Sequence, residues 1–260
     1  MPVYKAQSTI RTAVVSCLMA MPKNSELLIM LEGPNLESYD NLIPNDPRIK
    51  VTRNAKPSGV AGALNALLDQ ARGGIVARMD ADDICLPWRF RHQIRALQAK
   101  EADFVFSNVI LFGRRVRPLG FIPQPPSKLS ANSARLALGA VNPFVHPTML
   151  ANRETVQELG GYRNCPAEDH ELWLRAAAAN KIFVRTGPWV LLYRFHENQL
   201  TQQRDLSERI RADKSLEAMQ LKLNKILASE MGIEMGGGFP AEIWKRVERR
   251  NFGIWLENKV

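Results

Sequence analysis

The chain has 260 residues, of which 45% are hydrophobic and 23% are charged, and this composition is typical of a soluble globular protein. That length allows one large α/β domain, or a domain with a C-terminal appendage. No apolar run approaches the roughly 18 residues that cross a bilayer. No secretory signal is recognisable either, so the sequence predicts a cytoplasmic protein.

The charge of the chain indicates which partners it could bind, and its cysteine content indicates its redox compartment. The formal net charge is +9, and residues 104–153 hold six basic residues and no acidic one. Such a region attracts an anionic lipid, a nucleic acid or a polyanionic substrate, or it is a solvated loop. The aromatic-studded basic patterns of nucleic-acid modules are absent, so no nucleic-acid partner is expected. Cys17, Cys85 and Cys165 are scattered and odd in number, which indicates a reducing compartment.

Strand-like and helix-like apolar patterns alternate along the first 112 residues. The expected strands are 1–4, 26–31, 49–53, 75–80 and 103–112, and the expected helices are 9–19, 60–71 and 88–99. This alternation predicts an α/β fold with a mostly parallel central sheet flanked by helices.

Three carboxylates, Asp80, Asp82 and Asp83, follow the apolar run 75–77 directly. The run is interpreted as a buried parallel strand, and ligands of α/β sheets bind at the carboxyl ends of such strands. Carboxylates this close repel one another unless a divalent cation is present. A hard ion held by one or two carboxylates, phosphate oxygens and water is the Mg²⁺ or Mn²⁺ pattern of enzymes that act on phosphorylated substrates. The alternative is that these aspartates cap a helix that begins near Pro87.

Beyond a Pro-rich loop at 118–126 the pattern becomes α+β. Helices are expected at 130–138 and 153–159, and short strands at 148–151, 182–185 and 190–194. A second acidic cluster at 168–171 precedes an expected helix at 172–179, with Asp169 as its N-cap.

The C-terminal part is expected to be helical from Leu206. One apolar stripe there is formed by Leu216, Met219, Leu223 and Ile226. Three glycines at 236–238 then interrupt the pattern before a basic amphipathic segment at 243–256. That segment either lies on an anionic membrane surface or folds back on its own domain.

Several blocks of the sequence resemble family 2 glycosyltransferases. They are MPVYKAQSTIRTAVVSCLMAMPKNSELLIM, SGVAGALNALLDQARGGIVARMDADDICLPWRFRHQI, NPFVHPTML, LGGYRNCPAEDHELWLRAA and LLYRFHENQLT. Together they cover roughly residues 1–200 in the family's order and spacing, which is more specific than any lone motif. The resemblance implies a GT-A domain at 1–200, followed by a helical extension at 201–260 that contacts a membrane or a partner.

The same resemblance implies an inverting transfer of sugar from a nucleotide-diphosphate sugar to a hydroxyl of a glycan or lipid-linked saccharide, with Mg²⁺ or Mn²⁺. Asp80 and Asp82 match the family's Asp-x-Asp motif. Asp82 is the implied metal ligand, while Asp80 and Arg78 are implied to lie near the ribose and pyrophosphate. Asp169, beside Glu168, matches the Glu-Asp motif and is the implied general base.

Other matched positions are implied to bind the donor. Pro2 and Tyr4 fall where the first strand ends against the nucleotide base. Glu32 takes the place of an aspartate that reads the nucleobase. Gly59 and Asn65 belong to the nucleotide-binding block.

Three histidine and tryptophan positions belong to the acceptor-side block. His196 sits where many GT-A enzymes have a histidine that contacts the metal, as a ligand or next to one. His146 and Trp173 are interpreted either as the wall of the acceptor pocket or as ordinary core residues.

The chain departs from the family pattern in three places. The first strand is nearly absent before Pro2, Lys5 replaces an asparagine, and Leu31-Glu32-Gly33-Pro34 replaces Asp-Asp-Gly-Ser. These departures leave open a degenerate domain that binds glycans or partners. A phosphatase of the haloacid dehalogenase type, with Asp80 as nucleophile, is a further alternative. Peripheral contact with an anionic membrane at the inner face of the cell membrane is expected from the basic charge.

Overall fold

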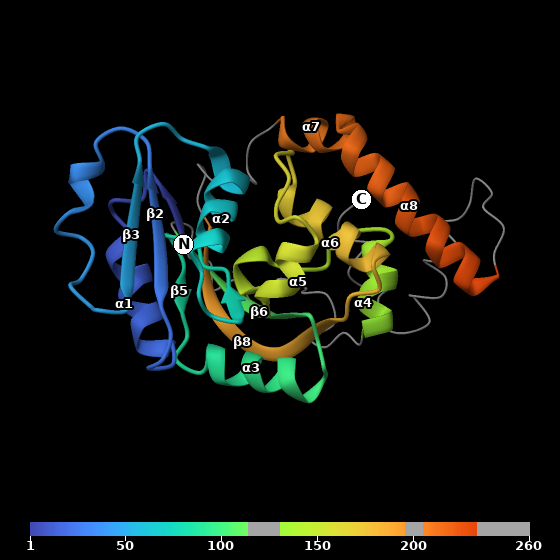
Figure 1. Ribbon diagram of the computed structural model, residues 1–260, viewed down its shortest axis with the longest axis horizontal. Helices are drawn as coiled ribbons and strands as arrows, with labels where there is room; N and C mark the ends of the chain where they lie inside the picture. The colour runs from blue at the N-terminus through green and yellow to red at the C-terminus, as the bar shows by residue number, and fades with distance from the viewer. Residues whose placement is uncertain (114–130, 196–204, 233–260) are drawn as a thin grey trace.

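The computed structural model describes residues 1–113, 131–195 and 205–232 (Figure 1). Four predictions lie outside these ranges: the loop at 118–126, His196, the glycines at 236–238 and the basic segment at 243–256. Among the helices that are described, none is both long enough and apolar enough to cross a membrane.

Strands and helices alternate through the first half of the chain, as the sequence predicts. The strands are β1 (Pro2–Tyr4), β2 (Leu27–Glu32), β3 (Ile49–Asn54), β4 (Ile75–Ala77), β5 (Ile84–Cys85), β6 (Phe104–Gly113), β7 (Leu150–Asn152) and β8 (Phe183–Phe195). The α-helices are α1 (Ile10–Ala20), α2 (Gly59–Gln70), α3 (Arg89–Ala99), α4 (Ala131–Leu138), α5 (Arg153–Glu158), α6 (Glu168–Ala178), α7 (Leu206–Ala212) and α8 (Lys214–Met231). Short 3₁₀ turns occupy Leu36–Tyr39 and His146–Thr148. The α/β class is confirmed.

The strands form two sheets. In the first, β1, β2 and β3 pair in parallel, and their last residues Tyr4, Glu32 and Asn54 lie in one row across the sheet. The second sheet has the order β4-β7-β6-β8-β5, in which β6 and β8 are parallel and the other neighbours antiparallel. Three strands therefore bring their carboxyl ends to one edge of the first sheet, where α/β proteins bind ligands.

The strand before Asp80, Asp82 and Asp83, here called the acid motif, differs from the expected one. β4 ends at Ala77 rather than Asp80, pairs antiparallel with β7, and leaves Ile75 37% exposed. The prediction of a buried parallel strand is wrong because a short apolar run looks the same at the edge and at the centre of a sheet. The backbone N–H of Arg78 still donates to the carbonyl of Met149 at 3.0 Å.

Other boundaries move for similar reasons. The two strands expected at 182–185 and 190–194 are one 13-residue strand, β8, whose pairing with β6 shifts register around Asn108. Such irregularities let one strand continue through residues that look like a break in sequence, here Thr186–Pro188. The short strand β5 was not expected.

The two largest apolar clusters of the described residues fill most of the interior. The larger joins α2, β6, α4, α6 and α8 and contains the fully buried Trp173, which meets Phe104 and Phe106 edge-on. The other joins α1 to β1, β2 and β5 through residues such as Ile10 and Ile29. The position of Trp173 confirms the core interpretation of this side chain.

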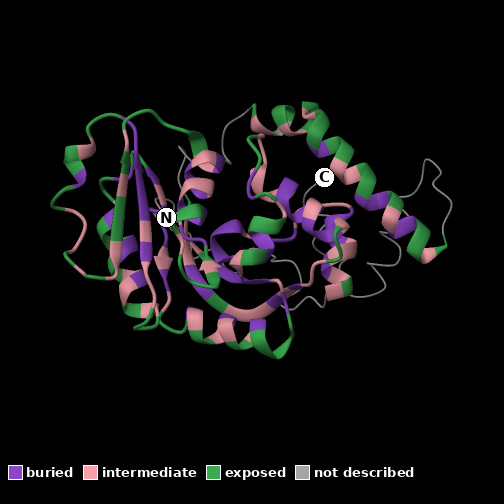
Figure 2. Ribbon diagram, in the orientation of Figure 1, coloured by how far each residue is buried: buried purple, intermediate pink, exposed green. Residues whose placement is uncertain are grey.

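Helix α8 packs against this larger cluster. Figure 2 shows buried and exposed residues alternating along α8, with Leu216, Leu223 and Leu227 buried. Arg135 on α4 connects the two helices, since its guanidinium donates hydrogen bonds of 2.6 and 3.0 Å to the carboxylate of Glu230 on α8. The predicted stripe is confirmed at Leu216 and Leu223, and Leu227 rather than Ile226 is its next buried member.

A buried arginine fixes the chain behind the acid motif. Arg89 is fully buried and donates to the carbonyl oxygens of Arg78 at 2.6 Å and Pro147 at 2.9 Å. Its Nε donates to Gln93, which in turn donates to the carbonyl of Thr148 at 2.6 Å. These bonds replace sheet pairing where β4 has ended, so backbone groups that would be left unpaired are satisfied.

Replacing Arg89 by methionine removes these donors but keeps a long apolar side chain. We expect a loss of about 3 kcal/mol in the free energy of unfolding, because several buried carbonyls lose their partners. Urea denaturation measures the loss. Arg95→Met, an exposed position on the same helix, is the matched control and should stay within about 0.5 kcal/mol of wild type. Equal stability of the two variants would contradict the role given to Arg89.

Candidate active site

The three aspartates of the acid motif converge in space. Oxygens of Asp80, Asp82 and Asp83 all lie within 4.8 Å of one another. Helix α3 begins only at Arg89, with Trp88 as its N-cap, so the alternative of helix capping is wrong. Carboxylate oxygens gathered this closely are the donor set of Mg²⁺ and Mn²⁺.

Asp83 is the most buried of the three, at 1% exposure. Its Oδ1 accepts the backbone N–H of Arg194 at 2.8 Å, while Oδ2 is buried and has no hydrogen-bond partner among the described residues. Burial, together with the charges of Asp80 and Asp82, raises the pKa of Asp83 to about 8. A cation beside the motif would remove this repulsion, so the residues present fit a divalent ion.

Arg78 supplies the positive charge next to the motif. It is buried, its Nη2 lies 2.5 Å from Asp80, and its Nη1 donates to the carbonyl of Met79 at 2.6 Å. The charge of Arg78 also lowers the pKa values of Glu168 and Asp169, which burial raises. Arg78 is therefore close to both acidic clusters.

The second cluster lies in the first turn of α6. The N-cap of this helix is Ala167, so the prediction of Asp169 as N-cap is wrong. Asp169 lies one residue inside the helix, and its carboxylate accepts bonds from the backbone N–H of His170 at 2.7 Å and from Asn142 at 3.1 Å. Burial raises its pKa. This carboxylate is thus held in place by two donors.

Glu168 connects the two clusters electrostatically. Burial and the charge of Asp169 raise its pKa to about 7, and the charge of Asp80 adds to the rise. Asp80 can act on Glu168 only if the two side chains lie near one another. The backbone N–H of Arg78 also donates to Met149, which follows the turn of His146, and His146 Nδ1 lies 3.9 Å from Glu168. The end of β4 and the first turn of α6 are therefore neighbours.

His146 and Tyr162 lie beside Glu168. His146 Nε2 lies 3.0 Å from the hydroxyl of Tyr162, and its Nδ1 lies 3.9 Å from Glu168. Burial and the charge of Arg78 lower the pKa of His146 well below 6.5, so its ring is neutral. With its exposure of only 9%, His146 is a hydrogen-bonded core residue at the edge of the site.

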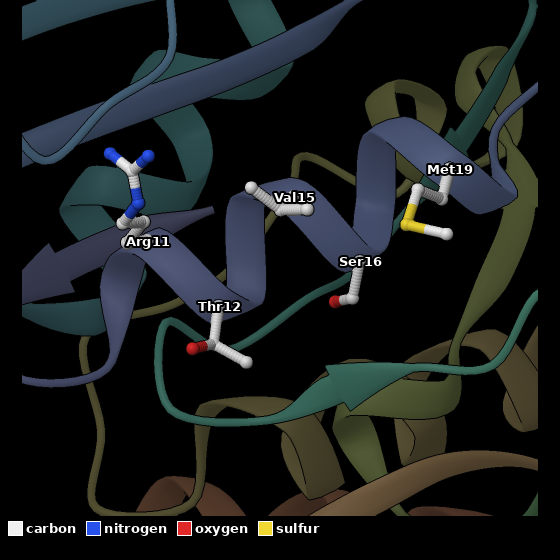
Figure 3. Close-up of a pocket in the computed structure, with 5 residues that line it drawn as sticks. All are labelled: Arg11, Thr12, Val15, Ser16 and Met19. Atoms are coloured by element: carbon white, nitrogen blue, oxygen red, sulfur yellow. The ribbon is translucent and has the colours of Figure 1, made fainter.

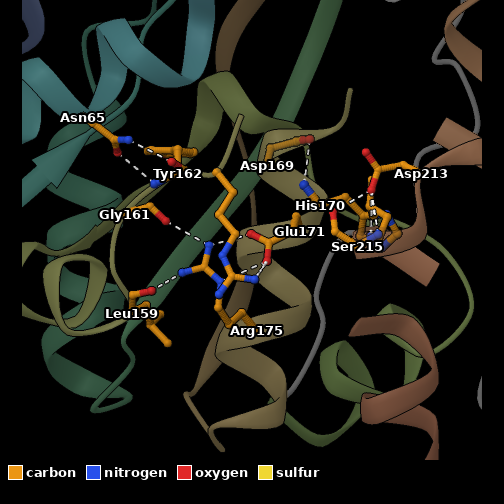
Figure 4. A network of polar contacts seen from close by, with 12 residues as sticks. Asn65, Leu159, Gly161, Tyr162, Asp169, His170, Glu171, Arg175, Asp213 and Ser215 are labelled. Atoms are coloured by element: carbon orange, nitrogen blue, oxygen red, sulfur yellow. Dashed lines mark hydrogen bonds and ion pairs between the residues drawn. The ribbon is translucent and has the colours of Figure 1, made fainter. Parts of the chain in front are cut away.

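The loop between α5 and α6 is braced from two sides (Figure 4). Asn65 on α2 accepts the N–H of Tyr162 and donates to its carbonyl, both at 2.8 Å. Gly161, with φ +65°, passes so close that an added Cβ would lie 2.5 Å from Asn65 Oδ1. Asn65 thus holds Tyr162 in place, and its predicted donor contact stays a prediction.

An ion pair holds the other side of the loop. Glu171 is fully buried and accepts from Arg175 at 2.5 Å and from Arg163 at 3.0 Å. Arg175 also donates to the backbone carbonyls of Leu159 and Gly161 (Figure 4). Because this loop leads directly into α6, the ion pair fixes the position of the first turn of α6, which carries Glu168 and Asp169.

The predicted nucleotide-base contacts gather at the ends of β1 and β2. Tyr4 is 53% exposed and lies beside Glu32 in the sheet. Glu32 is 6% exposed, and its Oε1 accepts from the N–H and hydroxyl of Ser58 at 2.9 and 2.5 Å. This bond holds the turn into α2, where Gly59 has φ +76°. Glu32 therefore has a structural task; base contact by Glu32, Tyr4, Gly59 and the neighbouring Pro2 stays a prediction.

Figure 3 shows a hollow elsewhere on the molecule. It is lined by Arg11, Thr12, Val15, Ser16 and Met19, all of which belong to α1. None of the predicted site residues lines it.

Sequence reasoning missed three residues around the acids: Asn142 bonds to Asp169, Arg194 bonds to Asp82 and Asp83, and Tyr162 bonds to His146. All three lie within the blocks that resemble the family. Nothing in their local sequence shows their partners, which come from elements far away along the chain. His196 lies outside the described residues, two positions beyond Arg194.

Comparison with known sequences agrees with this geometry. The profile described as Glycosyl transferase family 2 matches residues 1–160. Amylovoran biosynthesis glycosyltransferase AmsE of Erwinia amylovora is 32% identical over 158 residues, 58% of this chain and 57% of that protein. The chain also aligns with 63% of an uncharacterized glycosyltransferase of Haemophilus influenzae, so it spans less than two thirds of these relatives.

A third relative names its reaction. UDP-Glc:alpha-D-GlcNAc-diphosphoundecaprenol beta-1,3-glucosyltransferase WfgD of Escherichia coli is 26% identical over 185 residues, which are 70% of each protein.

Solved structures show the same fold. TarS of S. aureus, in complex with UDP-GlcNAc, superposes with a TM-score of 0.58 over 92% of this chain and 73% of its own, at 16% identity. Mannosyltransferase PcManGT of Pyrobaculum calidifontis, in complex with GDP-Man and Mn2+, gives a TM-score of 0.62 over 98% and 80%, also at 16% identity. A transferase family with this fold replaces the phosphatase interpretation. The chain belongs to glycosyltransferase family 2 and has the GT-A fold.

Proposed function

We propose that this chain is a metal-dependent, inverting glycosyltransferase that moves a sugar from a nucleotide-diphosphate sugar to a hydroxyl of a glycan or lipid-linked saccharide. One observation carries the proposal: Arg78 pairs with Asp80 at 2.5 Å and donates its backbone N–H to Met149, which follows the turn whose His146 lies 3.9 Å from Glu168. The acids after β4 and those of α6 are therefore neighbours. Two acids in one site can divide the work of holding the donor and activating the acceptor.

Asp169 takes the role of general base. Its two hydrogen bonds, from Asn142 and from the backbone of His170, hold the carboxylate in one orientation. Burial raises its pKa, which makes the ionised form a stronger base toward a hydroxyl proton. Glu168 beside it is proposed to take part as the other acid of the Glu-Asp pair.

Asp82, Asp80 and His196 are proposed to serve the donor side, with Asp82 and His196 as metal ligands. A bound Mg²⁺ or Mn²⁺ supplies positive charge for the departing diphosphate. Asp80, anchored by Arg78, keeps the motif in place. The Mn2+ in the PcManGT complex supports this choice of ion.

The acceptor is proposed to be a lipid-linked saccharide at the inner face of the cell membrane. The name of WfgD gives a diphosphoundecaprenol-linked acceptor for that relative. The net charge of +9 favours contact with an anionic membrane surface, and no nucleic-acid partner is proposed. Residues 1–200 are proposed as the catalytic domain and 201–260 as an extension, of which α8 packs on the domain through Leu216 and Leu223.

A degenerate domain that only binds glycans or partners is the second candidate, because Oε1 of Glu32, at the position expected to read the nucleobase, already accepts two bonds from Ser58. Thermal-shift screening of UDP, GDP and dTDP sugars with Mn²⁺ separates the two candidates, since ligand binding raises apparent stability. A transferase should be stabilised by at least one of these donors. The absence of any shift would favour the binding module.

Asp169→Asn should lower kcat by about 10²–10⁴, because the amide cannot accept the hydroxyl proton. Donor affinity should change less than about twofold. Turnover with the best donor from the screen, and calorimetry of donor binding, measure the two quantities. Asp69→Asn, an exposed position on α2, is the control and should behave as wild type. Near-normal turnover of Asp169→Asn would show that another group is the base.

Asp82→Ala should weaken Mn²⁺-dependent donor binding by about tenfold or more, because a carboxylate ligand is lost. Binding measured in EDTA should differ little between variant and wild type. Calorimetry with and without Mn²⁺ tests this difference. If both proteins bind the donor equally well with Mn²⁺, Asp82 does not hold the ion.

Glu168→Gln should make stability less dependent on pH. The pKa of Glu168 rises from 4.5 to about 7 on folding, so the folded state holds an extra proton between these values and loses stability as pH rises through them. Glutamine cannot ionise, so from pH 5 to pH 8 the variant should gain about 2 kcal/mol relative to wild type. Urea unfolding in EDTA measures this, with the exposed Glu154→Gln as control. If the free energy of unfolding changes equally between pH 5 and pH 8 in Glu168→Gln and in wild type, the pKa of Glu168 is not raised on folding.

A further inference from the structure

Arg194, near the end of β8, makes two hydrogen bonds to the acid motif. Its backbone N–H donates to the carboxylate of Asp83 at 2.8 Å. Its side-chain Nε donates to the carbonyl oxygen of Asp82, also at 2.8 Å. One residue thus holds two consecutive residues of the motif, one through its backbone and the other through its side chain.

These bonds begin where sheet pairing stops. β5 pairs with β8 at Ile84 and Cys85, opposite Leu192 and Leu191. Asp82 precedes β5 and lies in a turn, so no strand pairing fixes its backbone. The two bonds from Arg194 extend the contact between β8 and the segment before β5 by two residues, Asp83 and Asp82. Asp82 carries the carboxylate that is proposed to bind the ion.

The side chain of Arg194 is itself held in place. Its guanidinium lies over the ring of Phe112, 4.4 Å from the ring centre, and Phe112 is its neighbour across the parallel pair of β6 and β8. An arginine stacked on an aromatic ring loses little freedom when it forms a further bond. The sheet therefore sets the position of Nε, and Nε sets the position of the Asp82 carbonyl.

We propose that Arg194 is a positioning residue for metal binding: its Nε–H fixes the backbone of Asp82, so that the Asp82 carboxylate is presented to the ion in one orientation. This inference rests on the proposed function, because it assumes that Asp82 holds a divalent ion. Groups that orient a metal ligand from behind typically contribute tenfold or more to metal affinity. Arg194 does not touch the donor or the reacting atoms in this account.

A pair of neutral variants isolates the hydrogen bond. Arg194→Gln and Arg194→Met both remove the charge and the stacking group. Only glutamine carries an N–H as many bonds from Cα as the Nε of arginine, and methionine places a methyl group there. We expect the Mn²⁺ dissociation constant of Arg194→Met to exceed that of Arg194→Gln by about fivefold or more. The readout is free Mn²⁺ followed by electron paramagnetic resonance, with UDP present and no transfer reaction.

Stability separates positioning from unfolding. Both variants should have the same urea midpoint as each other, and the exposed Arg95→Met should bind Mn²⁺ as wild type does. Equal Mn²⁺ affinity of the glutamine and methionine variants overturns the positioning role while leaving the proposed function intact. A wild-type chain that binds no Mn²⁺ overturns both.

A second matched pair applies if Arg194→Met does not fold. Phe112→Tyr keeps an aromatic ring under the guanidinium of Arg194, whereas Phe112→Leu removes it, and neither change touches a carboxylate. The positioning role requires weaker Mn²⁺ binding by Phe112→Leu than by Phe112→Tyr, by about fivefold or more. Equal affinity, with both variants folded, counts against it.

Discussion

The guanidinium of Arg78 lies buried close to two groups of carboxylates, and the arrangement of both groups depends on its charge. On one side it pairs with Asp80 at 2.5 Å, and on the other it lowers the raised pKa values of Glu168 and Asp169. Buried carboxylates of one sign repel strongly in a medium of low dielectric constant. The fixed charge of Arg78 offsets part of the repulsion among these acids, since it pairs with Asp80 and lowers the pKa values of Glu168 and Asp169. A divalent ion beside Asp82 would offset more of it.

The chain around these acids is held mainly by side chains that bind backbone carbonyls. Arg89 donates to the backbone carbonyls of Arg78 and Pro147, and Arg175 donates to the carbonyl of Gly161 in the loop before α6. The reason is geometric: one group of acids follows the end of β4 and the other follows the loop between α5 and α6, so the backbone beside both has no sheet pairing and needs other partners. Arginine suits this task because one guanidinium presents several donors in a rigid plane. The rigidity of the site thus comes from residues that take no part in the proposed chemistry.

Several features were predictable from the sequence and others were not. The two acidic clusters, the alternation of strands and helices, and the buried stripe of α8 at Leu216 and Leu223 follow from local pattern, and the structure confirms them. The burial and direction of β4 and the role of Asp169 as N-cap were predicted wrongly. Periodicity reports which residues are apolar, but it does not report which strand lies next to which, or at which residue a helix takes its first turn.

By itself the sequence determined the chemistry that is available: which carboxylates exist, that they come in two clusters, and that each follows or opens a regular element. Only the tertiary structure decided that the end of β4 lies near the first turn of α6, that Glu32 and Asn65 are bound to Ser58 and Tyr162, and that Arg194 reaches the motif from β8. The physical reason is separation along the chain. Local preferences act over a few residues, whereas these contacts join residues 26 to 112 positions apart and form only when the core packs.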